Sequence, residues 1–581
     1  MNISSRLGRL LNLLYLFSIP VLGWGQVELR YEDNYSLTYE EAIQAYEELD
    51  RSHEEAKLLT YGMTDVGKPL QLFIISASGE FDADVLKSKD KAIVLILNGI
   101  HPGESCGIDA SVELSRDILR NKDGLHSFLD NTVLCIVPVY NIGGALNRSA
   151  YHRTNMDPPV EAGFRGNAQN LDLNRDFIKL DTRNTWSFVE LYREWDPDVF
   201  LDNHVTNGSD HQYTITLINS VIERLDPGLG KFLEEIMLPD LYESMKDTPY
   251  EMTPYVHYLF RSPDRGIAQP NDPPRFSAGY TALFNSLSFL NETHVYKPFA
   301  DQVKGSYHFM RVLFEFTSLH AADIIGIREN ARTQTTRLSE YSFDWEIDSS
   351  MVDKIYFKGY AYRTKTSKLT GQSMNYYDRN EPWESEISYL KTYKAGITVP
   401  VPDYFIIPQA WTEVIKRLKW NGIEMYPLAA DSMIDVDMFY IEDIEHSLRP
   451  SNGHFAHQSI KLKEESGKLQ FYSGDMIIPS RQAGKRYLME TLDPRAEDSF
   501  LKWNFFDPIL DRREYIDPSR FEKWAVEILA NDPELKKGFE KWKTENPESA
   551  AISYYQLQFI YTHSEWAEQT HRRYPVYRIS P

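Results

Sequence analysis

The 581-residue chain has only two cysteines, Cys106 and Cys135. A fold held together mainly by disulfides is therefore excluded. If the chain is exported, these two thiols could pair. Two buried free thiols fit the sequence equally well, because their separation in space is not fixed by it.

Basic residues are also scarce relative to acidic ones: 62 Lys and Arg stand against 85 Asp and Glu, a net charge of −23. This excess disfavours a nucleic-acid backbone or an anionic membrane surface as partner of the molecule as a whole, although local basic patches are compatible with it. Aromatic residues, by contrast, make up 13% of the chain, which argues against a disordered protein.

Long apolar runs are absent beyond the first 25 residues. There, Arg6 and Arg9 precede an apolar stretch over 10–24, and the chain turns polar from Gln26. This layout predicts a signal peptide over 1–25. An uncleaved anchor is the alternative, but the stretch is shorter than the ~20 residues that a span needs. We therefore expect an exported protein, periplasmic or extracellular, without stable membrane insertion after signal cleavage.

Short apolar runs alternate with longer mixed segments between about 92 and 330. Four runs rich in β-branched and aliphatic residues are typical of buried strands: 91–100, 131–140, 196–204 and 286–294. Three segments have helical spacing of their apolar residues: 106–121, 185–195 and 304–325. Strands interleaved with helices predict an α/β domain, a mostly parallel mixed sheet with flanking helices.

The length predicts two to four domains. After the α/β domain, placed over 26–332, shorter alternating strands indicate a β-rich accessory region over 333–490. Residues 491–581 are predicted to form a mostly helical region that packs on the rest. Within it, the aromatic segment 498–515 is interpreted as a packed interface, with a roof over a substrate cleft as the alternative.

Four chemically capable side chains follow three of the predicted strands. His101 and Glu104 come after the first strand in the sequence HPGE, His204 closes the third, and Glu292 closes the fourth. Because the carboxyl ends of parallel strands share one edge, where ligands bind, we expect one pocket. Taken singly, each has an ordinary explanation: a surface turn, a buried histidine, a helix cap. Together they favour a site.

Two histidines and one glutamate form an established ligand set for catalytic zinc. His101, Glu104 and His204 are the predicted ligands of one zinc ion, because the Pro-Gly turn lets the first two bend toward a common point. Zinc lowers the pKa of its water to about 7. Glu292 is then the predicted general base, a role that contributes typically ~10²–10⁴-fold to the rate.

With the segment LDLNRDF added, the chain resembles the zinc metallocarboxypeptidases of the carboxypeptidase A-like family. The resemblance covers roughly residues 55–325 and is carried by HPGE, LDLNRDF, LDNHVTNG and LNETHVYKPFADQV. It implies the same ligands and base, with a peptide or peptide-like substrate. It also implies that Asp172 orients the first histidine, and that Asn174 and Arg175 hold the substrate carboxylate.

Other correspondences are looser. The family places an arginine beside the zinc to stabilise the oxyanion; Arg153 is narrowly favoured over Arg148 for this role. Tyr280 is the candidate for the family's substrate-contacting tyrosine. Arg275 could serve a substrate anion, but a surface salt bridge is the preferred interpretation.

Three further residues near the motifs affect the assignment. Asp176 stands where many family members have an amide, which places an acid beside Arg175 and weakens simple carboxylate recognition. His211 and His294 are expected to support the ligands or to lie on the surface rather than to bind metal.

The resulting hypothesis is an exported zinc metallocarboxypeptidase that hydrolyses a C-terminal peptide bond. One alternative is a zinc amidase acting on a non-standard amide, such as a peptidoglycan stem peptide or an N-acyl amino acid. Another is an inactive protein that binds peptides or glycans, which the intact ligand set disfavours. Oligomeric state and side-chain preference do not follow from the sequence.

Overall fold

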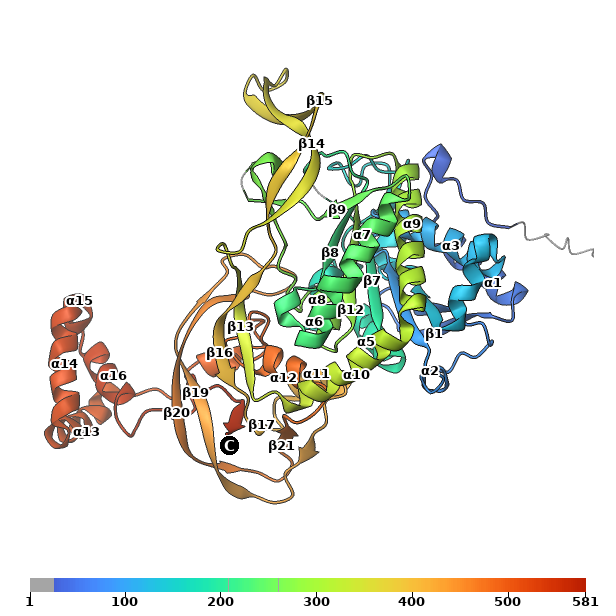
Figure 1. The fold of residues 1–581 in the computed structure, drawn as a ribbon. Helices are drawn as coiled ribbons and strands as arrows, with labels where there is room; N and C mark the ends of the chain where they lie inside the picture. The colour runs from blue at the N-terminus through green and yellow to red at the C-terminus, as the bar shows by residue number, and fades with distance from the viewer. Residues whose placement is uncertain (1–25, 207, 260, 581) are drawn as a thin grey trace, which may run out of the picture.

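The computed structural model describes residues 26–206, 208–259 and 261–580 (Figure 1). The signal peptide predicted over 1–25 lies outside the described residues. Across those three ranges, no helix has both the length and the apolar character needed to cross a bilayer.

An eight-stranded mixed sheet forms the centre of the N-terminal half. Its order is β1 (Ala56–Met63), β2 (Pro69–Ile75), β4 (Thr132–Val137), β3 (Ala92–Asn98), β7 (Val199–Val205), β12 (Leu287–Thr293), β8 (Ile215–Asn219) and β9 (Met252–Pro254). The four middle strands, β4, β3, β7 and β12, run parallel. All four strands predicted from apolar runs are present, and the α/β prediction is confirmed.

Both faces of the sheet are covered, which is why its middle strands are apolar without alternation. Along β3, Val94 and Ile96 belong to one core with α1 (Tyr39–Ser52), α3 (Cys106–Leu119) and α9 (Phe299–Leu319). Ile93 and Leu95 point the other way, into a core shared with α5 (Arg183–Trp195). That second core also takes in the accessory region.

The helix predicted over 304–325 is in fact two. α9 ends at Leu319, and α10 (Ala321–Arg337) begins after His320, whose ring stacks on Phe316. The apolar spacing continues across this break, so the sequence does not mark it. Residue 332, the predicted end of the α/β domain, falls inside α10.

Shorter elements complete the N-terminal half. The helices among them are α2 (Ala83–Lys87), α4 (Ile142–Leu146), α6 (Pro227–Phe232), α7 (Leu238–Lys246) and α8 (Ser277–Ala282). The strands among them are β5 (Arg148–Ser149), β6 (Ala162–Gly163), β10 (His257–Tyr258) and β11 (Ile267–Ala268).

The accessory region is rich in β-structure, as expected. A long hairpin of β14 (Asp353–Thr366) and β15 (Ser373–Leu390) extends from the body at the top of Figure 1. A six-stranded sheet has the order β18 (Tyr426–Pro427), β21 (Met476–Pro479), β17 (Tyr404–Ile407), β22 (Tyr577–Ile579), β19 (Ser432–His446) and β20 (His457–Phe471). The remaining elements are β13 (Glu340–Ile347), β16 (Tyr393–Pro400), α11 (Thr412–Trp420) and α12 (Lys485–Leu492).

The C-terminal region divides into two parts. Phe500, Leu501 and Phe506 pack into the core shared with the α/β domain, which agrees with the packed interface expected over 498–515. Four helices then stand apart from the body in Figure 1: α13 (Pro518–Asn531), α14 (Pro533–Glu545), α15 (Pro547–Ala550) and α16 (Ser553–Thr562). Side chains of α13, α14 and α16 form a small core of their own. The expectation that the whole of 491–581 packs on the rest is therefore corrected.

Candidate active site

The turn after β3 brings two of the predicted ligands together. The backbone N–H of Glu104 donates to the carbonyl of His101 over 2.8 Å, which closes a four-residue turn and sets both side chains on one side. Gly103 is required here: a Cβ at this position would lie 2.6 Å from the Cγ of Arg153 and 2.7 Å from the carbonyl oxygen of Gly163. The turn is therefore packed tightly against the segment that carries Arg153.

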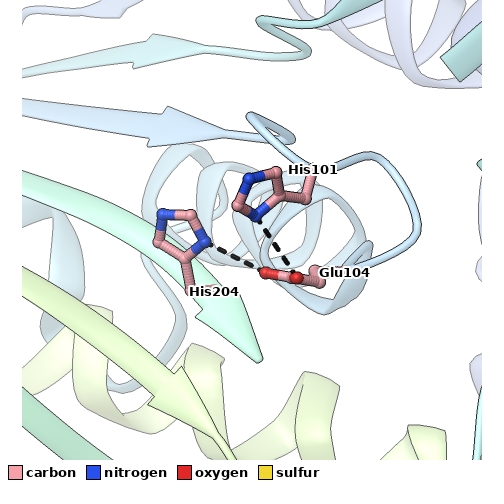
Figure 2. A group of neighbouring side chains, drawn as sticks. All are labelled: His101, Glu104 and His204. Carbon is pink, nitrogen blue, oxygen red and sulfur yellow. Dashed lines mark hydrogen bonds and ion pairs between the residues drawn. The ribbon is translucent and has the colours of Figure 1, made fainter. Parts of the chain in front are cut away.

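His101, Glu104 and His204 converge at the carboxyl edge of the sheet (Figure 2). Nδ1 of His101 lies 3.3 Å from Oε1 of Glu104, and Nδ1 of His204 lies 3.0 Å from Oε2. One ligand atom from each of the three buried side chains falls within 4.8 Å of the others. Within the described ranges, no other group of three such side chains meets the same spacing.

The far nitrogen of each imidazole is held by a carboxylate. Nε2 of His101 donates to Oδ1 of Asp172 over 2.9 Å, and Nε2 of His204 donates to Oδ2 of Asp202 over 2.9 Å. Since a carboxylate can only accept, these bonds place a ring proton on Nε2 of each histidine, so Nδ1, which faces Glu104, is the nitrogen that would bind a metal. Nδ1 of His101 is buried without a hydrogen-bond partner. This donor set fits a zinc ion.

Charges around the site are tightly coupled. Burial opposes ionisation of Glu104, but His101 and Arg153 outweigh it and hold the pKa of this carboxyl well below its usual range. Burial also opposes protonation of His204, yet Asp202 and Glu104 raise the pKa of its ring well above the usual value. Carboxylates thus flank both imidazoles and favour positive charge between them.

Glu292 lies beside this group. It is directly opposite His204 in the pairing of β12 with β7, so both side chains project on the same face. Burial, together with the charge of Glu104, raises the pKa of Glu292 to about 7, although His204 and His101 oppose the shift. Unlike the three predicted ligands, Glu292 keeps partial exposure. A carboxylate that exchanges protons near neutrality is suited to act as a general base.

Of the two candidate arginines, the structure places Arg153 at the site. Its Nη2 lies 2.6 Å from Oε1 of Glu104, and the side chain is only 8% exposed. Arg148 points away and binds the N-terminal segment, donating to the carbonyl of Leu37 and to Oγ of Ser36.

Asn174 and Arg175 are both beside the ligands. The side-chain amide of Asn174 lies 3.3 Å from Nε2 of His204, and its Oδ1 accepts from the backbone N–H of Ser277 over 3.0 Å. Arg175 donates to the carbonyl of Asn174 over 2.7 Å and lies 4.2 Å above the ring of Phe276. Asn174 is therefore committed to internal contacts, whereas Arg175 keeps further N–H donors for an anion.

The expectation that Tyr280 contacts substrate is corrected. Its side chain is fully buried, and its hydroxyl donates to Oδ1 of Asn421 over 2.6 Å. The ring packs against Phe177, Tyr192 and Phe284 in the core shared with the accessory region. The position of Tyr280 near the motifs suggested a substrate contact, but in this structure its buried hydroxyl is bonded to Asn421 instead.

Asp176 does not face Arg175. It is buried at the start of α5, where its carboxylate accepts from the backbone N–H of Asp181 and from the hydroxyls of Thr182 and Thr185. The doubt that this acid cast on carboxylate recognition is removed, because its charge is used to hold the loop that leads into α5.

Arg275 forms the preferred salt bridge, but not on the open surface. Its two Nη atoms pair with Asp498 at 2.7 Å and with Glu497 at 2.8 Å, and Asp498 is fully buried. His211 and His294 also lie in the interior: their ring centroids are 4.2 Å apart, and His294 contacts Asp210. The expectation of a surface role is wrong for both histidines.

Two residues at the site were missed by sequence reasoning. Asp202 stands two positions before His204, and alternate residues of a strand share a face, so this spacing could have identified it. Arg165 pairs with Asp172 at 2.9 Å and reaches Glu104 at 3.4 Å. Arg165 lies in a loop, where no periodic pattern predicts which way a side chain points.

Cys106 and Cys135 are both free and buried.

Comparison with known proteins gives the following. Residues 43–206 match the family model described as zinc carboxypeptidase. Carboxypeptidase 2 of Trichophyton equinum is 20% identical over 430 residues, covering 71% of this chain and 74% of the relative. A probable carboxypeptidase 2 of Arthroderma benhamiae is 24% identical over 470 residues, covering 78% and 81%. A solved metallo-carboxypeptidase from Pseudomonas aeruginosa aligns at 15% identity with a TM-score of 0.37, over 50% of this chain and 70% of that one.

Proposed function

We propose that this chain is an exported zinc metallocarboxypeptidase that removes the C-terminal residue of peptides, with Glu292 as general base. The observation that carries the proposal is the paired arrangement of His101 and His204. Each ring is held at Nε2 by a carboxylate and turns Nδ1 toward Glu104. Export is supported by the basic and apolar pattern of residues 1–25.

His101, Glu104 and His204 would hold the metal, which supplies Lewis-acid activation of the attacking water and of the scissile carbonyl. Glu292 takes the proton of the attacking water and passes it to the nitrogen of the leaving residue. A carboxyl whose pKa lies at about 7 can carry out both transfers near neutral pH.

Two arginines have separate tasks. Arg153, buried against Glu104, donates to the carbonyl oxygen of the scissile bond as negative charge develops there. Arg175, stacked on Phe276, binds the terminal carboxylate of the peptide through its planar guanidinium. Both groups are positioned before substrate arrives, so little reorganisation is needed during the reaction.

Of the two features that made the zinc amidase credible, Asp176 no longer favours it, and predicted export is common to both proposals. Asp176 suggested an unusual substrate because an acid beside Arg175 would repel a carboxylate, yet its side chain is buried under α5. No observation at the site favours an inactive binding protein, since the ligands, their carboxylate partners and Glu292 are all in place.

A matched pair of substrates tests the proposal. Blocked dipeptides with a free C-terminus are compared with the same peptides carrying a C-terminal amide, each with and without chelator. We expect release of the terminal residue from the free acid only, abolished by chelator and restored by zinc. Equal cleavage of acid and amide, or preferential cleavage of peptidoglycan stem peptides, would contradict the proposal.

A further inference from the structure

One tight turn of the accessory region lies against the chain segment that carries Asp172. Residues 447–456, called the rim loop below, join β19 to β20. At its tip, Ser451 and His454 exchange two backbone hydrogen bonds, of 2.8 and 3.1 Å. Between them, Asn452 and Gly453 have φ angles of 49° and 83°. An Asn-Gly pair with both φ angles positive is the preferred turn for a hairpin of this kind.

The tip of the rim loop lies against the chain segment that carries Asp172. Oδ1 of Asn452 accepts the backbone N–H of Asp172 over 3.3 Å, across 280 positions of sequence. Immediately beside it, a Cβ placed on Gly453 would lie 3.6 Å from Leu171, which is ordinary packing distance. The accessory region therefore touches the α/β domain directly behind the carboxylate that holds His101.

A second contact fixes the position of this tip. Nε2 of His454 donates to Oδ2 of Asp181 over 2.8 Å. Asp181 also pairs with Lys179 at 3.0 Å and with Arg417 at 3.3 Å, so its place is well determined. Burial opposes ionisation of Asp181, but His454 and Lys179 outweigh it and lower the pKa of its carboxyl. His454 thus holds the turn against Asp181, while Asn452 at the same tip contacts Asp172.

The side chain of Asp172 has its own partners. Oδ1 accepts from Nε2 of His101 and from the backbone N–H of Asn174 at 3.0 Å, and Oδ2 accepts from Arg165. Asn452 supplies the contact to the backbone of the same residue. Any shift of that backbone moves the carboxylate, and with it the ring of His101.

We infer that Asn452 is a positioning residue of the zinc site: it fixes the backbone of Asp172, and through Asp172 the orientation of His101. The accessory region is then part of the metal centre rather than a separate module. The inference rests on the proposed zinc site but not on the identity of the peptide that is cleaved.

Two substitutions at one position separate the side-chain contact from the shape of the turn. Asn452→Gly preserves the positive φ angle and removes the acceptor, whereas Asn452→Asp keeps an acceptor oxygen. The matched control is Asn121→Gly, at an exposed asparagine with φ 52° whose Oδ1 accepts the backbone N–H of His126. All are made in the full chain. Release of zinc to a chelator is measured alongside kcat and KM.

We expect Asn452→Gly to release zinc several-fold to about 10-fold faster and to lower kcat with little change in KM. A residue hydrogen-bonded to a metal ligand typically contributes ~10–100-fold to metal affinity or activity, and Asn452 acts on such a residue rather than on the ligand itself, so a smaller effect is expected. Asn452→Asp and Asn121→Gly should stay within about twofold of wild type, on the same argument. Unchanged zinc release in Asn452→Gly overturns the inference, as does an equal change in the control or in Asn452→Asp. A wild-type protein that binds zinc but cleaves no peptide refutes the proposed function alone, and one that binds no zinc refutes both.

Discussion

Glu292 and His204 stand directly opposite one another on β12 and β7. Because paired residues of neighbouring strands project on the same face, the backbone alone puts the proposed base beside a proposed ligand. Asp202 lies on this face too, two positions before His204. The sheet therefore fixes three of the groups, while the turn after β3 supplies His101 and Glu104.

Replacing Glu292 with Gln removes the proton carrier while keeping the size of the side chain. We expect kcat to fall by ~10²–10⁴-fold, which is the typical contribution of a positioned general base to the rate. Zinc content should stay at the wild-type level, because Glu292 is not a ligand. Measuring both quantities on one preparation checks the assignment, and full activity in this variant would refute it.

The carboxylates behind the two imidazoles should control metal affinity. Asp172→Asn and Asp202→Asn each lose the charge that holds Nε2 of a ligand, which should weaken zinc binding by ~10–100-fold. Competition with a zinc chelator measures this. Asp443→Asn, at an exposed position of β19, is the control and should match wild type. Wild-type affinity in both active-site variants would contradict the assigned roles.

Arg153 and Arg148 offer a matched comparison of two nearby arginines. Arg153→Ala removes a donor aimed at the developing oxyanion, so kcat should drop by ~10²–10³-fold. Arg148→Ala breaks contacts to Ser36 and Leu37 and should lower stability while leaving kcat of the folded protein near wild type. Steady-state kinetics with both variants decides this, and the reverse pattern would move the role to Arg148.

Much of the fold and the core of the site could be predicted from the sequence. The runs that became β3, β4, β7 and β12 are buried on both faces and carry a continuous apolar signal. The proposed ligands follow these strands, so their convergence is a consequence of topology. Arg165 and Asn452 could not be found in this way, because loop contacts across long sequence separations leave no periodic signal.

For Tyr280, by contrast, the sequence predicted a role in the site that the structure does not support. Its place before the β12 motif suggested a substrate contact, but the side chain is buried, and Asn421 of the accessory region accepts a hydrogen bond from its hydroxyl. The orientation of that side chain depends on a region more than a hundred residues away. A motif comparison limited to the α/β domain carries no information about it.

Asp109 should make the stability of the protein depend on pH. Burial raises its pKa to about 8, although the backbone N–H of Leu37 partly offsets this. The folded state then binds a proton that the unfolded state releases near pH 3.9, so the free energy of unfolding falls between about pH 4 and 8, by up to ~1.4 kcal/mol per pH unit.

Asp109→Asn removes this titration and keeps an acceptor for Leu37. Urea unfolding at pH 5 and pH 8 should therefore show a smaller loss of stability in the variant than in wild type. If both proteins lose the same stability between these two pH values, the protonated state assigned to Asp109 is wrong.

The most direct test of the metal centre is a crystal structure of the zinc-loaded protein with anomalous data collected at the zinc edge. One peak is expected, with Nδ1 of His101, Nδ1 of His204 and a carboxylate oxygen of Glu104 each at about 2.0–2.2 Å from it. A peak bound through Nε2 of either ring, or one placed away from these three side chains, would contradict the account.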